Sequence, residues 1–584
     1  MDKKTCAFLM GLGMLCSIPL FSEGLVLGDD IHYHLTRIEG IYQGLRGGEF
    51  PVRINSMQNA GFGNLSATMY PQLFLYPAAL LRLLGMPLIG CYKALLTAVN
   101  IATAFCAYLG ARGITKSHKM AMTAACLYTF AGYRLSNIYF RGALGETLAM
   151  VFLPIVLWGV YEVLWGDRKN WPVLMLGVTG VVQSHVLSLE MILVFGVLEF
   201  VCWLFLGPVG EKLSRIGAGL LAAVVTVLLN AGFLVPFLYF SGEELQCFYI
   251  PNELRSHVLY ISQMFSFFSV PEGGTQSLGT TQGEMPLSVG GILLLGSVLS
   301  VLWLTIKEKD KVLTKGEGVG KHCLIYGVFA LLLCTWVFPW EQLLSLEWFG
   351  RVTASLQFPW RFLSLATLFL TIASAVAIVG FGEERNARWL YGFFVLVLAA
   401  GTGFFFDALA HNAPQTCDEA WVESMMVSDS NYMYREGDSF QALHLNYSLE
   451  DAYVKAKGEV SLSDYVKCAT SIRLQATAGE ESELLFPLYY FPGYRVLVNG
   501  ERTPCYRKDT LVACRIPEGS SRVEIRYIGL PAFWAGDIVS WFTAAGLAFF
   551  GGRKAWKLRP QGFKFGFGQC KSQGKRKGIK EKGG

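Results

Sequence analysis

The sequence predicts a mainly α-helical protein that crosses a membrane many times and carries one β-rich domain. Of its 584 residues, 53% are hydrophobic and only 16% are charged, whereas an ordinary soluble domain has about 25% charged residues. Long apolar runs recur along the chain, and alternating apolar and polar residues are concentrated between 407 and 531. We therefore do not expect nucleic-acid binding as the main role, despite a net charge of +5.

The apolar runs define the predicted membrane spans, since a transmembrane helix needs about 20 mostly apolar residues. About twelve segments meet this requirement: 5–22, 88–111, 119–134, 147–165, 172–186, 187–206, 216–239, 286–306, 323–339, 362–381, 389–406 and 532–550. The first one reads as an uncleaved anchor, because no small-x-small cleavage site follows Leu20. The run 71–84 is short and contains two prolines and an arginine, so we interpret it as interfacial.

The distribution of lysine and arginine predicts the orientation, because these residues favour the cytoplasmic side. Basic residues precede the first span and then follow every second span. We therefore expect a protein of the cell membrane with both termini in the cytoplasm. A transmembrane module fills 1–406 and includes a first outer loop, 23–87; an extracytoplasmic β-rich domain fills 407–531. The last span, 532–550, is followed by a basic tail, 551–584, that we expect to be disordered.

The extracytoplasmic domain has the sequence pattern of a small β-sandwich. Segments 484–490, 494–498, 510–516 and 522–528 are strand-like, and Asn499-Gly500 is typical of a hairpin turn. Four cysteines fall in this domain, where oxidation can occur: Cys417, Cys468, Cys505 and Cys514. Cys505 and Cys514 flank a hairpin-like stretch and are the better candidates for a disulfide, although the pattern leaves both oxidation states open.

The first candidate site follows the first span, at Asp29 and Asp30. From Ile31 onward, apolar residues recur at helical spacing. On such a helix Asp30, His34 and Arg37 share a face, so that Asp30 could accept a proton while Arg37 faces an anion. The local pattern fits equally well a solvated pair of aspartates that caps an amphipathic interfacial helix.

Asp30 and His34 could also hold a divalent metal ion such as Mg²⁺ or Mn²⁺. The pattern Asp-x-His-x-His, which begins at Asp30, offers hard and borderline ligands that suit several divalent ions. The sequence identifies no third protein ligand, which makes this the weaker interpretation.

A second cluster lies between the third and fourth spans and contains Arg134, Asn137, Arg141 and Glu146. If the segment is helical, the first three share a face. Two arginines at the outer membrane edge oppose the usual charge bias. They indicate either a phosphate pocket with Glu146 as a partner or snorkelling arginines that pair with this glutamate.

Two further residues lie at predicted outer membrane edges. His185 occupies a tight turn between spans, where a lone histidine is more often a packing residue than a binding residue. Arg361 follows Trp360 in the segment QFPWRF, 357–362; the tryptophan alone is typical of an interface anchor, and the arginine adds a candidate contact to a lipid phosphate. The chain has no Walker-type loop, G-x-S-x-G, H-E-x-x-H or dinucleotide fingerprint.

Several of these segments together resemble a known class of membrane enzymes. The relevant segments are the acidic pair, then His34-Leu35-x-Arg37-x-Glu39-Gly40, GEFPVR (48–53), Tyr70-Pro71, QFPWRF (357–362), YYFPGYRVLVNGE (489–501), IPEG (516–519) and VEIRY (523–527). In their order and predicted placement they resemble GT-C glycosyltransferases, and more narrowly the bacterial YfhO-like and pterin-synthase-related membrane proteins.

The resemblance implies a GT-C-like fold and sugar transfer on the outer face from a polyprenyl-phosphate-linked donor. A carboxylate in the first outer loop then serves as base or metal ligand, a role that falls on Asp30 or Asp29. Arg134, Arg141 and Arg361 are placed to contact the donor phosphate, with His34, Arg37, Glu146 and His185 nearby. The acceptor is expected to be an envelope glycan or glycolipid, and the β-rich domain either binds it or caps the active site.

Two other classes of function remain open on the sequence. A transporter or flippase of a lipid-linked or anionic substrate would also use many spans and outer arginines, and predicts charged residues deep in the spans and repeat symmetry. A non-catalytic scaffold for envelope assembly predicts that the acidic pair is dispensable.

Overall fold

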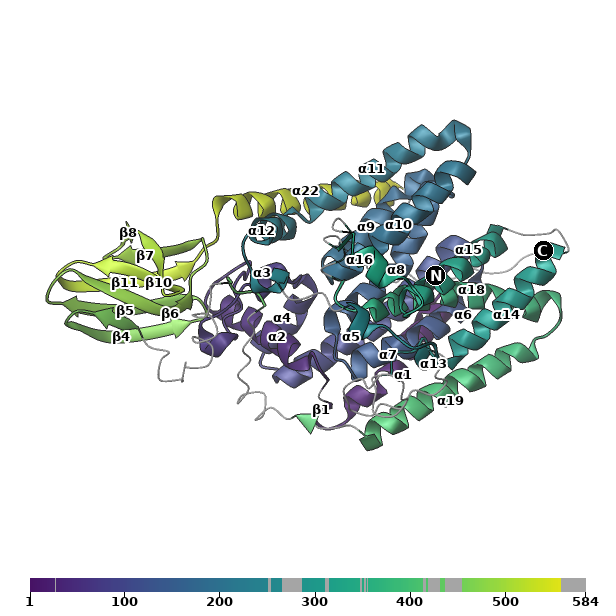
Figure 1. Cartoon of the computed structure of the whole chain (residues 1–584), viewed down its shortest axis with the longest axis horizontal. Coiled ribbons are helices and arrows are strands. Elements are labelled where there is room, and N and C mark those ends of the chain that lie inside the picture. Colours follow the sequence, from purple (N-terminus) through teal and green to yellow (C-terminus); the bar gives the residue numbers. More distant parts are fainter. Residues whose placement is uncertain are drawn as a thin grey trace, which may run out of the picture.

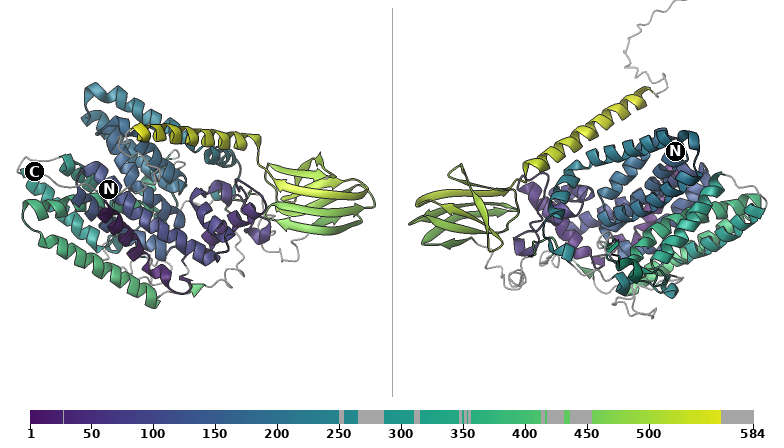
Figure 2. Two further views of the ribbon diagram at one scale, coloured as in Figure 1. Left: turned by 180° about the vertical axis from the view of Figure 1, so that it is seen from behind. Right: turned by 45° about the horizontal axis from the view of Figure 1, so that its top comes forward.

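A helical bundle and a β-domain form the two ends of the molecule (Figure 1). The computed structural model describes residues 1–26, 28–249, 254–264, 286–309, 315–346, 349–350, 353, 356–412, 416–417, 431–435 and 454–557. The N-terminus lies in the bundle on the side away from the β-domain, and the C-terminal end of the last helix also points away from that domain (Figures 1 and 2).

Nine helices in the described part of the chain are long and apolar enough to cross a membrane, which identifies a multi-pass membrane protein. They are α5 (Leu88–Thr115), α8 (Leu144–Leu164), α10 (Val186–Leu206), α11 (Lys212–Leu229), α14 (Gly291–Lys309), α15 (Lys315–Leu333), α18 (Leu363–Glu384), α19 (Trp389–Asn412) and α22 (Pro531–Lys557). Each overlaps a predicted span, although α15 begins eight residues before the predicted 323–339. The orientation relative to the cytoplasm stays a prediction.

The other three predicted spans are helical but shorter than a bilayer crossing requires. They are α1 (Lys3–Cys16), α6 (His118–Thr129) and α9 (Trp171–Val182), with 14, 12 and 12 residues. At 1.5 Å per residue a 12-residue helix is only about 18 Å long, so the predicted twelve spans are not established. The predicted span 216–239 is also interrupted: α11 ends before Asn230 and α12 (Ala231–Ser241) follows it.

Helix α18 forms the centre of the bundle. The 18-residue apolar window of its span is entirely buried, and small residues let its neighbours approach closely. A Cβ atom at Gly296 of α14 would lie 2.3 Å from Ser374 Oγ, and one at Gly327 of α15 would lie 2.5 Å from Leu370 Cδ2. Close contact at small residues is how helices associate where lipid removes the hydrophobic driving force.

The predicted first outer loop, 23–87, is called the first outer segment below. It folds against the bundle as a group of short elements. The main one is the amphipathic helix α2 (Ile31–Arg46), which buries Ile31, Leu35 and Ile38 as the sequence predicts. The others are β1 (Leu25–Val26), η2 (Asn59–Gly61), α3 (Ser66–Met69), η3 (Leu73–Leu75) and α4 (Tyr76–Leu83). Helix α4 lies in the predicted interfacial run, and its Arg82 forms an ion pair with Glu39 of α2 (3.1 Å).

Short helices also occur between α6 and α19. Helix α7 (Gly132–Tyr139) precedes α8, and α13 (Ile261–Met264) precedes α14. Helix α16 (Trp340–Leu344) and the 3₁₀ turn η9 (Pro359–Phe362) lie between α15 and α18. The remaining described 3₁₀ turns are η1 (Ile18–Phe21), η4 (Arg168–Asn170), η5 (Val209–Glu211), η6 (Gln246–Tyr249) and η7 (Leu254–His257).

The β-domain is a sandwich of two antiparallel sheets, as predicted. One sheet has the order β3 (Lys455–Lys457), β6 (Ser482–Tyr489), β10 (Leu511–Ile516) and β9 (Cys505–Lys508). The other has the order β4 (Val460–Cys468), β5 (Ser471–Ala478), β11 (Gly519–Tyr527), β7 (Tyr494–Val498) and β8 (Glu501–Thr503). Asn499 and Gly500 connect β7 to β8 with positive φ angles of 53° and 86°, which a tight hairpin turn requires.

The two candidate disulfide cysteines are neighbours but are not joined. Cys514 of β10 pairs directly with Cys505 of β9 across the sheet, and both thiols are free. The cysteine at 468 is also free. Cys417 belongs to β2 (Thr416–Cys417), which pairs with β1, but its side chain lies outside the described residues, as does most of the predicted tail (558–584). The first residues of that tail continue α22 as far as Lys557.

The β-domain rests on the first outer segment through buried polar contacts. Glu49 Oε1 accepts hydrogen bonds from Thr470 N (3.1 Å) and Thr470 Oγ1 (2.6 Å). Lys467 Nζ donates to Gly61 O (2.7 Å) and to Pro487 O (3.0 Å). Burial lowers the pKa of Lys467 to about 8. These contacts fix the sandwich over the first outer segment.

Helix α22 is joined to the same segment by an ion pair. Arg53 Nη2 lies 2.6 Å from Asp537 Oδ2, and the two side chains are only 10% and 11% exposed. The Arg53 guanidinium also lies 5.4 Å from the ring centre of Phe533. The last helix and the first outer segment are therefore held together although they lie at opposite ends of the sequence.

Replacement of Arg53 by methionine should strongly destabilise the protein. The substitution leaves the Asp537 carboxylate buried without its partner, which typically costs about 3–5 kcal/mol. Lys119→Met is the control, because the ion pair of Lys119 with Glu383 is exposed (60% and 37%) and such pairs contribute at most about 1 kcal/mol. Thermal unfolding of both variants in detergent checks this; equal midpoints would contradict it.

Candidate active site

The acidic pair lies in a loop that interlocks with the connection between α7 and α8. Asp30 N donates to Arg141 O (2.9 Å). A Cβ atom at Gly28 would lie 2.4 Å from Phe140 O, and one at Gly142, whose φ is +66°, would lie 2.3 Å from Ile31 Cγ1. Only glycine fits at these two positions, so the local sequence places the Asp30 backbone directly beside Arg141.

The Glu146 carboxylate is the centre of the site. Its Oε2 lies 3.0 Å from Arg141 Nη1 and 4.0 Å from Arg361 Nε, and its Oε1 accepts a hydrogen bond from Tyr133 OH (2.6 Å). The side chains of Arg141, Arg361 and Glu146 are 6%, 9% and 2% exposed. Two arginines from distant parts of the sequence therefore share one buried glutamate.

Aromatic rings and a few hydrogen bonds hold the two arginines in place. The guanidinium of Arg141 lies 4.3 Å from the ring centre of Trp360 and donates to Asn137 Oδ1. The guanidinium of Arg361 lies 4.9 Å from the ring centre of Phe358, and its Nη1 donates to Leu356 O (3.0 Å). The buried Nε of Arg361 has no hydrogen-bond partner among the described residues.

The Asp30 carboxylate is near enough to this group for its charges to act on it, and it is not used as a helix cap. Asp30 is the residue that precedes α2, yet its side chain makes no capping hydrogen bond. Burial raises the pKa of Asp30, the charges of Arg141 and Arg361 oppose this shift, and Glu146 adds to it. Asp29 is exposed, and its pKa is raised by partial burial and by the charge of Asp30.

His34 and Arg37 lie next to each other on α2, as their spacing predicts. Arg37 Nη1 is 3.4 Å from His34 Nδ1, and Arg37 Nη2 donates to Pro71 O (2.5 Å) and Tyr70 O (3.2 Å). Burial lowers the pKa of His34 well below its usual value, and the charge of Arg37 adds to the shift. His34 is therefore neutral at pH 7.

Tyr70 connects this pair to the rest of the site. Its ring lies 4.2 Å from the guanidinium of Arg37 and 5.9 Å from the ring of His185. Burial raises the pKa of Tyr70 to about 12, with smaller effects from the charges of Arg37, Asp30, Arg361 and Glu146. His185 also caps α10, since its Nδ1 accepts a hydrogen bond from Ser188 N (3.3 Å), in accord with a packing role.

Arg134 does not join this group, contrary to the helical-face prediction. Its guanidinium is fully buried and donates to Asn100 Oδ1 (2.7 Å), Thr103 Oγ1 (2.9 Å) and Thr129 O (2.9 Å). These contacts join α5, α6 and α7. Helix α7 ends at Tyr139, so Arg141 lies beyond it and does not continue the face of Arg134.

Sequence reasoning missed two tyrosines of the site. Tyr133 precedes Asn137 by four residues, which places the two on one face of α7. Since Asn137 was already grouped with Arg141 and Glu146, this spacing could have added Tyr133 to the group. Tyr70 was visible only as part of a short motif with Pro71. Its proximity to Asp30 depends on the fold of the first outer segment.

The described residues do not provide a metal-binding group around Asp30 and His34. No cluster of three or more His, Cys, Asp and Glu side chains with metal-binding geometry occurs in the described ranges. The charges acting on Asp30 include two arginines, which disfavour a cation at this place. These ligands do not fit a divalent ion by themselves, and a metal at Asp30 and His34 stays an untested prediction.

The charges of the site favour an anionic ligand. Three guanidinium groups, those of Arg37, Arg141 and Arg361, all act on His185, and the carboxylates of Asp30 and Glu146 lie among them. These five side chains carry one net positive charge when both carboxylates are ionised. Buried guanidinium groups at a membrane edge are suited to bind a phosphate.

Comparison with known proteins gives only distant similarities. No family model matches the chain. A protein of Lactococcus lactis subsp. cremoris, described as uncharacterized, is 22% identical over 245 residues, which are 39% of this chain and 38% of that protein. The chain thus corresponds to well under half of the length of this relative.

Among solved structures, the chain is similar to the apo oligosaccharyltransferase of Archaeoglobus fulgidus, with a TM-score of 0.39, 12% identity, and coverage of 72% of this chain and 58% of that one. It is also similar to the oligosaccharyltransferase AglB of the same organism in complex with an inhibitory peptide and a dolichol-phosphate, with a TM-score of 0.39, 12% identity, and coverage of 70% and 56%. The chain matches little more than half of each of these proteins.

Replacement of Asp30 by asparagine should stabilise the protein more at high pH than at low pH. Since folding raises the pKa of Asp30, the folded state binds its proton more tightly than the unfolded state. The stability from this proton is fully present below the unfolded pKa, about 3.9, and is lost as the pH rises through the folded pKa. Thermal midpoints of wild type and Asp30→Asn at pH 5 and pH 8 measure the difference.

Asp2→Asn provides a control of opposite sign. The pKa of Asp2 is lowered, chiefly by a hydrogen bond from the Thr5 backbone, so its carboxylate stabilises the fold fully above the unfolded pKa of about 3.9. Asp2→Asn should therefore lower the midpoint by the same amount at pH 5 and at pH 8. A gain in midpoint for Asp30→Asn that is no larger at pH 8 than at pH 5 would contradict the burial of this carboxylate.

Proposed function

We propose that this protein is a membrane glycosyltransferase of the GT-C type. It moves a sugar from a polyprenyl-phosphate-linked donor to an acceptor on the outer face of the cell membrane, either an envelope glycan or a glycolipid. The proposal rests above all on one observation: the Asp30 backbone is bonded to Arg141 O (2.9 Å), and Arg141 and Arg361 are gathered in a buried group around Glu146 whose charges act on the Asp30 carboxylate. The sequence motifs of the first outer segment support it further.

The arginines are suited to bind the phosphate of a lipid-linked donor. Such a donor keeps its chain in the bilayer, so its phosphate stays at the membrane edge. Arg141 and Arg361 lie at the beginning of α8 and α18, two apolar helices of the bundle. The Nε of Arg361 lies 4.0 Å from Glu146 Oε2 and has no hydrogen-bond partner among the described residues, so it can supply a donor to the phosphate. Glu146 keeps the two cations close together.

Asp30, whose backbone N donates to Arg141 O (2.9 Å), is suited to act as the general base. A carboxylate whose pKa is raised accepts a proton more readily than an ordinary aspartate. In the proposed step the acceptor hydroxyl transfers its proton to Asp30 while its oxygen forms a bond to the anomeric carbon of the sugar. The bond between this carbon and the phosphate oxygen breaks, and polyprenyl phosphate leaves with both electrons. A single displacement of this kind inverts the anomeric carbon.

The arginines contribute most to the departure of the phosphate. Negative charge develops on the leaving oxygen, and fixed cations in a buried site stabilise this charge without having to reorganise. Contacts through Glu49 and Lys467 hold the β-domain over the first outer segment. From this position the domain either binds the acceptor or covers the site.

Asp30→Asn should abolish most sugar transfer. A general base contributes about 10²–10⁴-fold to a rate, and asparagine preserves the shape of the side chain. The assay uses membranes with the variant, polyprenyl-phosphate [¹⁴C]glucose or [¹⁴C]mannose as donor, and endogenous envelope polymer as acceptor. Undiminished transfer by a well-expressed Asp30→Asn variant would rule out this role.

Asp29→Asn is the matched control, because Asp29 is the exposed neighbour of Asp30 and its loss should reduce transfer far less. The same assay tests the metal prediction with EDTA. Loss of activity with EDTA that is restored by Mg²⁺ or Mn²⁺ would show that a metal ion takes part, and an unchanged rate would argue against it.

Arg361→Lys should weaken the use of the donor. Lysine keeps the charge but loses the planar group that stacks on Phe358 and directs Nε into the site. We expect a higher KM for polyprenyl-phosphate sugar and a lower kcat, and a KM for the acceptor within twofold of wild type. Arg46→Lys, on the exposed end of α2, is the control. An unchanged donor KM for Arg361→Lys would contradict phosphate binding here.

A further inference from the structure

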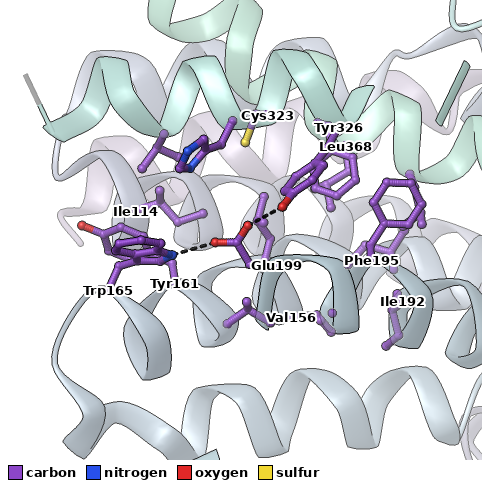
Figure 3. A pocket seen from close by; sticks show the side chains of 18 of the residues that line it. Ile114, Val156, Tyr161, Trp165, Ile192, Phe195, Glu199, Cys323, Tyr326 and Leu368 are labelled. Carbon is purple, nitrogen blue, oxygen red and sulfur yellow. Dashed lines mark hydrogen bonds between the residues drawn. The ribbon is translucent and has the colours of Figure 1, made fainter. Parts of the chain in front are cut away.

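A cavity lies among the helices of the bundle. Its volume is about 290 Å³, and its walls come from α5, α8, α10, α15 and α18 (Figure 3). This size is near the lower end for small-molecule pockets, about 300–1,000 Å³. Most of its lining is aliphatic or aromatic, including Leu153, Val156, Ile192 and Phe195.

The cavity extends from near the candidate active site to a polar end at Glu199. Leu365 of its lining follows Arg361 by only four residues, whereas the end at Trp165 is distant. Glu146 lies in the first turn of α8, whereas Trp165, which lines the cavity, follows the last turn of the same helix. At 1.5 Å per residue the two residues are about 28 Å apart along the helix axis. This distance is close to the thickness of the hydrocarbon core of a bilayer, about 30 Å, so the polar end of the cavity lies at the opposite end of α8 from Glu146.

One carboxylate interrupts the apolar lining. Glu199 of α10 accepts hydrogen bonds from Trp165 Nε1 to its Oε1 and from Tyr326 OH to its Oε2, both 2.6 Å (Figure 3). Both donors are neutral, and no Lys, Arg or His of the described chain forms an ion pair with Glu199. A carboxylate within a membrane span is expensive unless something pairs with it.

The rings around Glu199 suit a cationic partner. Trp165, Tyr161 and Tyr326 line the cavity beside the carboxylate (Figure 3), and the ring of His322 lies 6.3 Å from that of Trp165. Ammonium groups bind to the faces of aromatic rings, tryptophan best of all. A carboxylate that accepts from two neutral donors and is surrounded by such rings favours an ammonium group and repels a phosphate or carboxylate.

The wall of the cavity borders lipid. Leu193 and Val197 of α10 are 58% and 60% exposed on the bundle surface. Between them, a Cβ atom at Gly196 would meet nothing within 4 Å, and the same holds for Gly318 of α15. Both glycines line the cavity, so there is open space for an apolar chain where α10 meets the membrane.

We propose that this cavity binds a membrane lipid with an ammonium head group. The lipid inserts one apolar chain past Gly196 and directs its ammonium group at Glu199 among Trp165, Tyr161 and Tyr326. Trp165 is the C-cap residue of α8, so Glu199 lies at the level where that helix ends and lipid head groups begin. This site is independent of sugar transfer at Asp30.

Photolabelling tests the head-group preference. The full chain in a maltoside detergent is irradiated with a diazirine-bearing dodecylamine or with the dodecanoic acid of the same chain, and labelled peptides are identified by mass spectrometry. We expect the amine to label α10 and α15 at least 10-fold more than the acid. Equal labelling by the two probes, or labelling confined to other helices, would overturn the proposal.

Two variants separate the head group from the chain. Glu199→Gln should reduce the preference for the amine at least 10-fold. Gly196→Leu should fill the cavity and reduce labelling by the amine even when Glu199 is present. Gly217→Leu is the control, because Gly217 lies on α11 outside the cavity and its Cβ would also meet nothing within 4 Å. An unchanged amine preference in Glu199→Gln would overturn the assignment of the head group.

The natural source of the ammonium group is tested in nanodiscs. Native mass spectrometry should find phosphatidylethanolamine retained by the wild type in preference to phosphatidylglycerol, and this preference should be lost in Gly196→Leu. Labelling by the amine without any preference for phosphatidylethanolamine would overturn a bilayer lipid as the occupant.

Discussion

The buried Glu146 carboxylate is the constraint on which the candidate site depends. A single carboxylate in the first turn of α8 attracts Arg141 from the preceding connection and Arg361 from the beginning of α18. Without it, two cations would repel each other in a poorly solvated place. Because α18 is the central and fully buried helix of the bundle, the contact with Arg361 also connects this glutamate to the core of the bundle.

Backbone contacts then bring the first outer segment to this centre. Gly28 and Gly142 allow two loops to touch where any side chain would separate them. The Asp30 backbone consequently lies beside Arg141 although more than 100 residues separate the two. The proposed base and the proposed phosphate ligands are thus held by different forces, close packing in one case and charge in the other.

Much of this arrangement could be predicted from the sequence, for identifiable physical reasons. Apolar runs located all nine long helices, and alternation located β6, β7, β10 and β11. Placement on a common side of the membrane was enough to group Asp30, Arg141, Glu146 and Arg361. Prediction failed where a helix ends within an apolar or polar run. Asn230 separates α11 from α12 by hydrogen bonding to Thr226 O (2.7 Å), and the end of α7 at Tyr139 separates Arg134 from Arg141.

The length of α22 links the β-domain to the thickness of the bilayer. This helix has 27 residues, which is about 40 Å, and only Ile528, Gly529 and Leu530 separate it from β11. Its apolar part, Pro531–Phe550, has 20 residues and matches a hydrocarbon core of about 30 Å. A change in bilayer thickness is met by a change in tilt, and the ion pair with Arg53 passes such a tilt to the first outer segment. A thicker membrane would therefore bring α22 more upright and shift both the sandwich and the loop that carries Asp30, so that the lipid composition of the host membrane acts on the geometry of the site.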